Sequence, residues 1–328
     1  MEEEAILGRI GLQARQHRLG LDGLSIRVEF QAGLSGLGAY TVRDHILSGS
    51  EPVVNRLSVV YIWCRDGLRA FGFTLVAKNT VVKLLGDLGW RCAEYQYLTL
   101  RNLRLRSVQV DEIWSFCYAK ERNVPDAMKG KFGVGDVWTF VALDADTKLV
   151  PTWHVGRRSQ AAATFFLRDL ATRILNRVQL TTDGYPAYVE AVAQTFGEGV
   201  DYAQLVKLYA VRSDGNDPER RYSPSTCIGA RAQPRIGDPD PNQISTSFVE
   251  RQNLTMRMQM RRFTRLTNGF SKKVNNHAAA VALHFMWYNF GRVHQSLGKT
   301  PAMAAGVTDH RWTVEDVVGL LDSQRGSN

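Results

Sequence analysis

Two aspartates in the middle of the sequence have the residue type and setting of a metal-dependent catalytic site. Asp111 closes the apolar run SVQVD, and Asp183 closes the apolar run VQLTTD. Acids at the carboxyl ends of neighbouring strands in an open α/β sheet point into the crevice where ligands bind. Two carboxylates placed together repel each other unless one takes up a proton or a cation lies between them. The pattern therefore predicts a divalent metal site.

Magnesium is the cation that this setting favours, because it takes oxygen ligands and leaves positions for water and phosphate. Two Mg²⁺ ions, with Mn²⁺ as a substitute, can activate a water or a 3′-hydroxyl and stabilise the leaving oxygen of a phosphodiester. The chemistry indicated is phosphodiester cleavage and transfer without a covalent enzyme intermediate.

A third carboxylate, Glu250, lies near the start of the predicted helix ISTSFVERQNLTMRMQMRRF. Asn253 and Arg257 follow at i+3 and i+7, so they share its helix face. An acid flanked by an amide and an arginine on a basic helix suits a metal beside a phosphate backbone. A capping box formed by Ser247 and Glu250 is the alternative explanation.

The two aspartates also have ordinary structural explanations. Asp183 precedes a glycine, and Asp-Gly is a common turn pair. Asp111 could instead pair with a nearby arginine. Glu112 follows Asp111 but points to the opposite face of the strand, so it is left out of the predicted site.

Basic residues are concentrated in one part of the chain. The formal net charge is +9, and residues 246–300 hold nine Lys and Arg but a single acid, Glu250. A concentrated basic surface indicates contact with phosphates, which predicts DNA as a partner. A solvated helix face is the alternative for the arginine group. The basic residues predicted to bind DNA in this segment are Arg257, Arg261, Arg262, Arg265, Lys272 and Lys273.

The elements that must position the acids begin near residue 106. The sequence predicts, in order, a strand at SVQVDEIWSF, a hairpin with its turn at 144–147, a helix over 159–175, a strand at VQLTTDG, and helices over 185–194, 246–266 and 274–290. Residues 211–245 are rich in Pro, Gly, Asp and Arg and are predicted to be a loop insertion. The order predicts an α/β fold, an RNase H-like domain with a mixed sheet flanked by helices.

A small helical domain is predicted before the catalytic domain, over residues 56–104. Its second helix has an apolar stripe and is predicted to stop at Gly89. Two short helices joined by a turn fit a helix-turn-helix, and an ordinary helical hairpin is the alternative. Residues 1–55 show no clear period and form a region of unclear fold. The side chains predicted to face DNA from the second helix are Lys78, Asn79 and Lys83.

Composition excludes several other classes. The four cysteines show no CxxC spacing, so a zinc site is not indicated, and their wide separation suits a reduced cytosolic protein. No apolar run reaches the roughly 18 residues that a membrane span needs. The expected location is the cytoplasm, in association with the nucleoid and with no membrane.

The segments VDEIW, TTDGYPAY and FVERQNLTMRMQMRRFTRLTNGFSKK together resemble bacterial insertion-sequence transposases of the DDE type, close to the insertion sequence one group. The later YNFGRVHQSLGKTPAMAAG is similar to the end of that catalytic domain, so the likeness covers roughly residues 57–308. It implies a catalytic domain over 105–308, followed by a tail over 309–328. The residues that it implies as the metal-binding catalytic triad are Asp111, Asp183 and Glu250, and those near the active site or DNA are Asn253, Arg257 and His294.

The resemblance also implies a reaction. Water would cleave DNA at the terminal inverted repeats of an element, and the freed 3′-hydroxyl would attack target DNA. Because strand exchange needs two ends held together, we expect a homodimer or higher oligomer on DNA. The alternatives are an RNase H-like nuclease without strand transfer and a catalytically inactive DNA-binding regulator. Relatives of this kind usually open with a cysteine-rich zinc-binding module, which residues 1–55 do not match.

Overall fold

The computed structural model describes residues 30–32, 40–42, 78–209 and 227–322. Two three-residue strands near the start, β1 (Phe30–Ala32) and β2 (Tyr40–Val42), form an antiparallel pair of their own. Residues 56–77, the first part of the predicted helix-turn-helix domain, lie outside the described residues, as do residues 211–226 of the predicted insertion.

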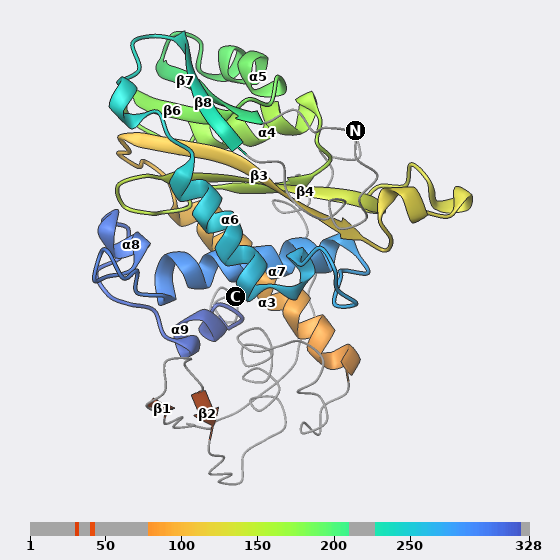
Figure 1. The fold of residues 1–328 in the computed structure, drawn as a ribbon. Coiled ribbons are helices and arrows are strands. Elements are labelled where there is room, and N and C mark those ends of the chain that lie inside the picture. Colours follow the sequence, from red (N-terminus) through yellow and green to blue (C-terminus); the bar gives the residue numbers. More distant parts are fainter. Residues whose placement is uncertain (1–29, 33–39, 43–77, 210–226, 323–328) are drawn as a thin grey trace.

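A six-stranded mixed sheet forms the centre of the described chain (Figure 1). Its strands are β3 (Ser107–Cys117), β4 (Gly135–Asp144), β5 (Trp153–Gly156), β6 (Val178–Asp183), β7 (Val200–Tyr209) and β8 (Cys227–Ile236). They lie in the order β5-β4-β3-β6-β7-β8; β3, β6 and β7 run parallel, and the remaining pairs are antiparallel. An antiparallel meander followed by two parallel strands is the RNase H-like arrangement, so the predicted fold class is confirmed.

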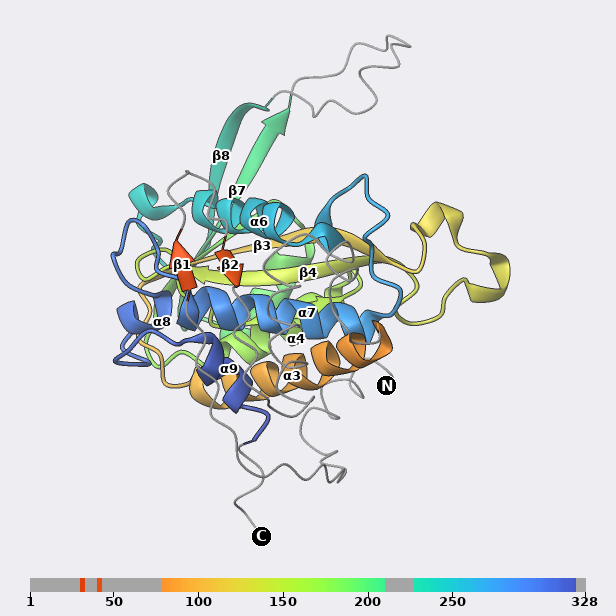
Figure 2. The same cartoon turned by 90° about the horizontal axis from the view of Figure 1, so that it is seen from below.

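Helices cover both faces of this sheet (Figures 1 and 2). Phe140 and Ala142 of β4 pack into one apolar cluster with α4 and α5, while Val141 and Leu143 pack into a second cluster with α6. This alternation follows from the two-residue period of a strand. The helices are α3 (Lys78–Thr99), α4 (Gln160–Ala171), α5 (Ala187–Phe196), α6 (Ser247–Gln259), α7 (Val274–Met286), α8 (Pro301–Ala304) and α9 (Val314–Gly319), with a π-helix over Trp287–Gly291.

The helix predicted to stop at Gly89 instead continues to Thr99. Gly89 lies where α3 meets α7, and a Cβ at this position would come within 2.3 Å of the carbonyl oxygen of Ala279. Glycine therefore serves close helix packing here and does not end the helix. Leu88 and Cys92, on either side of it, are buried in the same cluster as residues of the sheet. The second helix of the predicted helix-turn-helix thus packs on the catalytic core.

Part of the predicted loop insertion is a strand. β8 pairs with β7 in antiparallel register from Ile236 to Cys227, so the loop prediction is wrong for these residues. Nearly all of β8 is exposed, and Figure 2 shows β7 and β8 extending together away from the body as a two-stranded ribbon. This strand was not predicted from the sequence, because its Pro, Gly and Arg content is typical of loops.

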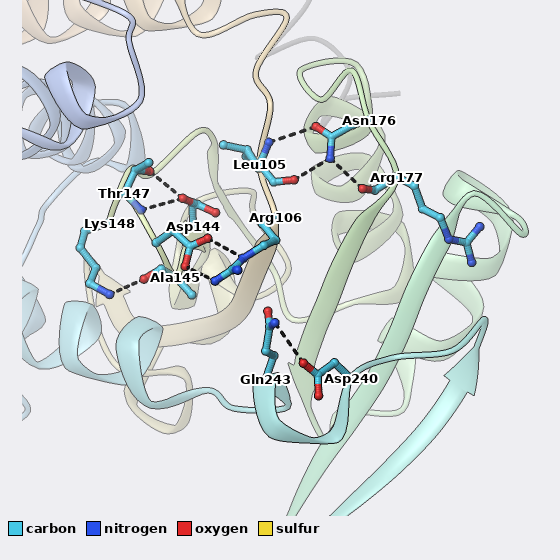
Figure 3. Close-up of polar contacts among 11 residues, drawn as sticks. Leu105, Arg106, Asp144, Ala145, Thr147, Lys148, Asn176, Arg177, Asp240 and Gln243 are labelled. Carbon is cyan, nitrogen blue, oxygen red and sulfur yellow. Dashed lines mark hydrogen bonds and ion pairs between the residues drawn. The ribbon is translucent and has the colours of Figure 1, made fainter.

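The amino end of β3 is tied to the segment before β6. The side chain of Asn176 accepts a hydrogen bond from the Leu105 amide (3.1 Å) and donates one to the Leu105 carbonyl (2.7 Å), as Figure 3 shows. Arg106, at the same end, forms an exposed ion pair with Asp146. Within the described part of the chain, no helix is both long enough and apolar enough to cross a membrane.

Candidate active site

Asp111 and Asp183 lie side by side on two parallel strands. The parallel register pairs Val110 of β3 with Thr182 of β6, and each aspartate is the next residue of its strand. β6 ends at Asp183, as predicted, but β3 continues to Cys117, so Asp111 does not close its strand. The two acids therefore lie where the parallel neighbour of β3 ends.

Glu112 joins these two acids, which corrects its exclusion. One carboxylate oxygen from each of Asp111, Glu112 and Asp183 lies within 4.8 Å of the others. The predicted direction of Glu112 is right, since its Oε2 accepts a hydrogen bond from Tyr188 of α5 at 2.8 Å. The longer glutamate side chain nevertheless brings its carboxylate to the same edge of the sheet.

Burial and mutual repulsion disfavour ionisation of this cluster. Burial, together with the charges of Glu112 and Asp183, raises the pKa of Asp111 to about 7. Burial is also the largest cause that raises the pKa of Asp183 and the pKa of Glu112. Crowded carboxylates of this kind are stabilised in their charged form by a cation.

Helix α6 lies against β3 on the Asp111 face of the sheet. The Oε1 atom of Gln109 accepts hydrogen bonds from the amides of Phe248 and Val249, at 2.8 and 3.1 Å, in the first turn of α6. One turn later, Nδ2 of Asn253 donates to Oδ2 of Asp111 at 2.9 Å. These contacts set the rotation of α6, so its Glu250 and Asn253 face the acidic strands.

Glu250 does not make the capping box with Ser247 that was the alternative explanation for it. Thr246 precedes the first residue of α6, and its side chain does not cap the helix amides. The Glu250 carboxylate instead pairs with Nζ of Lys207 on β7 at 2.5 Å and accepts a hydrogen bond from the Thr246 hydroxyl. Its charge adds to the burial that raises the pKa of Asp183, so it lies within electrostatic reach of the cluster without belonging to it.

Basic residues of α6 and the following turn differ in their exposure. Arg257 is half-buried near Asp111, whose charge partly offsets the burial that lowers the pKa of its guanidinium. Arg262 turns inward, where its Nη1 donates to the Ser271 hydroxyl at 3.0 Å. Arg261 and Arg265 are exposed. Two of the predicted DNA-binding arginines therefore reach solvent freely, and two are held against the protein.

The remaining predicted DNA-binding residues are spread over other elements. Lys272 and Lys273 are exposed just before α7, with the Lys272 ammonium 3.1 Å from the Phe270 ring centroid. Half-buried His294 contacts the Ser296 hydroxyl through Nδ1 at 3.1 Å.

On α3, Asn79 and Lys83 are exposed, and Lys83 pairs with Asp87 at 2.9 Å. The side chain of Lys78 lies outside the described residues. Among the described residues, no hydrogen bond or ion pair links Asn79, Lys83 or His294 to the three clustered acids.

The sequence interpretation missed three site residues: Glu112, Arg158 and Lys207. Adjacency to Asp111 was a usable signal for Glu112. No signal in the sequence pointed to Arg158 or Lys207, because each reaches the site only through the pairing of distant elements. Arg158 contacts Glu112 from the loop before α4, and Lys207 contacts Glu250 from β7.

No protein-family model matches the chain, and no curated protein matches it. Two similar solved structures are a simian T-cell lymphotropic virus intasome in complex with PP2A regulatory subunit B56 gamma and a piggyBac transposase synaptic complex with hairpin DNA. The first match has 15% identity and a TM-score of 0.33, and it covers 62% of this chain but only 56% of the other. The second has 11% identity and a TM-score of 0.37, and it covers 87% of this chain and 76% of the other. Neither likeness assigns a function to this chain.

Proposed function

We propose that this chain is a DDE-type transposase of a bacterial insertion sequence, which cleaves DNA at element ends and joins the freed 3′-hydroxyl to target DNA. The observation that carries the proposal is the registered pair Asp111 and Asp183, faced by Asn253 and Glu250 of a basic helix. Acids on neighbouring parallel strands beside a cationic helix suit metal-assisted chemistry on a phosphodiester.

The residues present fit a divalent cation. Asp111 and Asp183 of the cluster offer oxygen ligands, and a cation would stabilise the ionised form of Asp111, whose pKa is raised by burial and by the neighbouring charges. Among the described side chains, Oδ1 of Asn253 is buried without a hydrogen-bond partner, so an unused amide oxygen lies beside these acids. Oxygen donors of this kind are those that magnesium and manganese take.

In the proposed site, Asp111, Asp183 and Glu250 would hold the metal. When bound, Mg²⁺ supplies charge stabilisation for the attacking and leaving oxygens of the phosphodiester. Asn253 orients the Asp111 carboxylate through its hydrogen bond. Arg257, with exposed Arg261 and Arg265, neutralises DNA phosphates. Strand exchange between two element ends requires a dimer or higher oligomer on DNA.

An inactive DNA-binding regulator is the second candidate. The ion pair between Glu250 and Lys207 favours it, because the ammonium already neutralises the proposed third ligand. The two functions differ in whether the unmutated chain cleaves DNA at all.

The test uses DNA that carries the sequences flanking the coding frame. We expect cleavage and joining with Mg²⁺ or Mn²⁺, neither with EDTA, and neither for Asp183→Asn. Asp126→Asn is the matched control, because Asp126 is exposed and its one ion pair with a described residue is with Lys129 on the surface. Cleavage without joining identifies a nuclease, and metal-independent binding without cleavage identifies the regulator.

A further inference from the structure

An arginine lies on the side of the acidic cluster opposite α6 and is not part of the function proposed above. Arg158 lies in the loop before α4 and contacts Oε1 of Glu112 through Nε at 2.6 Å and Nη2 at 2.5 Å. Its charge lowers the pKa of Asp183, which places the guanidinium within electrostatic reach of that acid. Arg257 and Lys207 lie on the α6 side, so the site has cations on both sides.

The guanidinium of Arg158 is held more firmly than an ordinary surface arginine. Its central carbon lies 4.0 Å from the ring centroid of Tyr185 and 4.9 Å from that of Trp138. Stacking on aromatic faces and a charged partner restrict the rotation of the side chain. Such restriction lowers the entropic cost of binding a ligand at a defined place.

Glu112 is built to anchor this arginine. Its side chain is only 2% exposed, and its second oxygen accepts the hydroxyl hydrogen of Tyr188, which is fully buried. Burying an ionised carboxylate costs free energy unless it is paired and hydrogen-bonded. Both oxygens of Glu112 are engaged here. Tyr188 of α5 holds one oxygen, and the other oxygen fixes the position of the Arg158 guanidinium.

Arg158 also keeps a surface open to a ligand. Its side chain is 37% exposed, and among the described residues its Nη1 atom makes no hydrogen bond. An arginine with free donors, fixed beside a catalytic carboxylate, has the geometry for a phosphate oxygen.

We propose that Arg158 binds a DNA phosphate next to the reacting phosphodiester, and that Glu112 is the positioning residue that holds it there. The proposal rests on the function proposed above. DNA phosphates would thus be bound on both sides of the acidic cluster, by Arg158 on one side and by Arg257 on the other.

The test separates phosphate binding from structural support. Binding of uncut flanking DNA is measured in EDTA over a range of salt concentrations for the unmutated chain and Arg158→Gln. The slope of log K against log salt is negative, and loss of one phosphate contact reduces its magnitude by about 0.9. Arg106→Gln is the matched control, because Arg106 is also an ion-paired arginine, with Asp146 (Figure 3), but it precedes the first residue of β3 and does not contact Glu112. Its slope is expected to stay that of the unmutated chain.

Two further variants test the positioning. Arg158→Lys and Glu112→Gln keep a positive charge at position 158, so both are expected to retain the salt slope. Joining is expected to slow by roughly tenfold or more, because the positively charged group is no longer held in its place. An unchanged slope for folded Arg158→Gln overturns the proposal. If that variant fails to fold, unchanged joining by Arg158→Lys overturns it. If the unmutated chain neither cleaves nor joins, the proposed function fails, while the salt slope still decides whether Arg158 contacts phosphate.

Discussion

The side-chain amide of Asn253 donates a hydrogen bond to Oδ2 of Asp111 at 2.9 Å, joining α6 to the middle of β3. The other carboxylate oxygen, Oδ1, accepts from the backbone amide of Glu112, also at 2.9 Å. Both oxygens of Asp111 are therefore oriented, one by its own strand and one by the helix that carries Glu250.

Asn253→Ala removes the hydrogen bond by which α6 orients the Asp111 carboxylate. Loss of a residue that orients a metal ligand typically costs about 10–100-fold in metal affinity or activity. We expect a loss of this size in cleavage, with a higher Mg²⁺ concentration at half-maximal rate, measured by titrating Mg²⁺. Gln259→Ala, an exposed change at the end of the same helix, serves as the control. Equal Mg²⁺ dependence of Asn253→Ala and the unmutated chain would exclude this role.

The pair of Glu250 and Lys207 predicts opposite effects for its two members. Their side chains are 36% and 32% exposed, so breaking the pair is expected to change the free energy of unfolding by only about 0–1 kcal/mol. Glu250→Gln is expected to abolish cleavage, because it removes a proposed ligand. Lys207→Gln is expected to lower the Mg²⁺ concentration needed, because the ammonium no longer competes with the metal for Glu250.

Both variants are compared in the same cleavage assay, with thermal unfolding as the folding control. Full activity of Glu250→Gln would remove Glu250 from the triad. A higher Mg²⁺ requirement in Lys207→Gln would show that the lysine assists the site.

Gly89 provides a test of how α3 packs. Gly89→Ala forces a Cβ against the Ala279 carbonyl and is expected to destabilise the protein by about 1–3 kcal/mol, as overpacking does. Gly86→Ala lies in the same helix with open space around it, and it is expected to stabilise by roughly 0.5–1 kcal/mol. Urea unfolding of both variants measures the difference. Equal effects would mean that α3 and α7 are not in close contact.

His277 predicts a loss of stability at mildly acidic pH. The imidazole lies between Ser115 and Ser271, at 3.2 Å from Nε2 and 2.8 Å from Nδ1, and burial lowers its pKa to about 3. In the unfolded chain a histidine takes up a proton near pH 6.5. Between these values the unfolded state binds more protons, so the free energy of unfolding falls as pH drops below 6.5, by about 1.4 kcal/mol per unit.

His277→Gln removes this titration and leaves His154 and His284, whose pKa values are also lowered by burial, unchanged. Urea unfolding at pH 7.5 and 5.5 is expected to show a greater loss for the unmutated chain than for the variant, by about 1.4 kcal/mol. Parallel losses in both chains would show that His277 is not buried in its neutral form.

Local sequence determined much of the fold. The apolar runs that contain Asp111 and end at Asp183 predicted their strands correctly. The basic segment with Asn253 three residues after Glu250 predicted its helix, although the helix ends at Gln259 and not at residue 266. Strand and helix periods depend on neighbouring residues, so a single sequence contains them. The direction of Glu112 was predictable for the same reason.

Only the tertiary structure decided which side chains meet. Asp111 and Asn253 are 142 positions apart, and Lys207 and Glu250 are 43 apart, so no local period links either pair. Glu112 reaches the acidic edge because β6 ends at Asp183 while β3 continues. β8 is a strand because β7 offers it an edge to pair with, although its own residues favour a loop. Strand pairing and helix docking bring these groups together, and they depend on the whole chain.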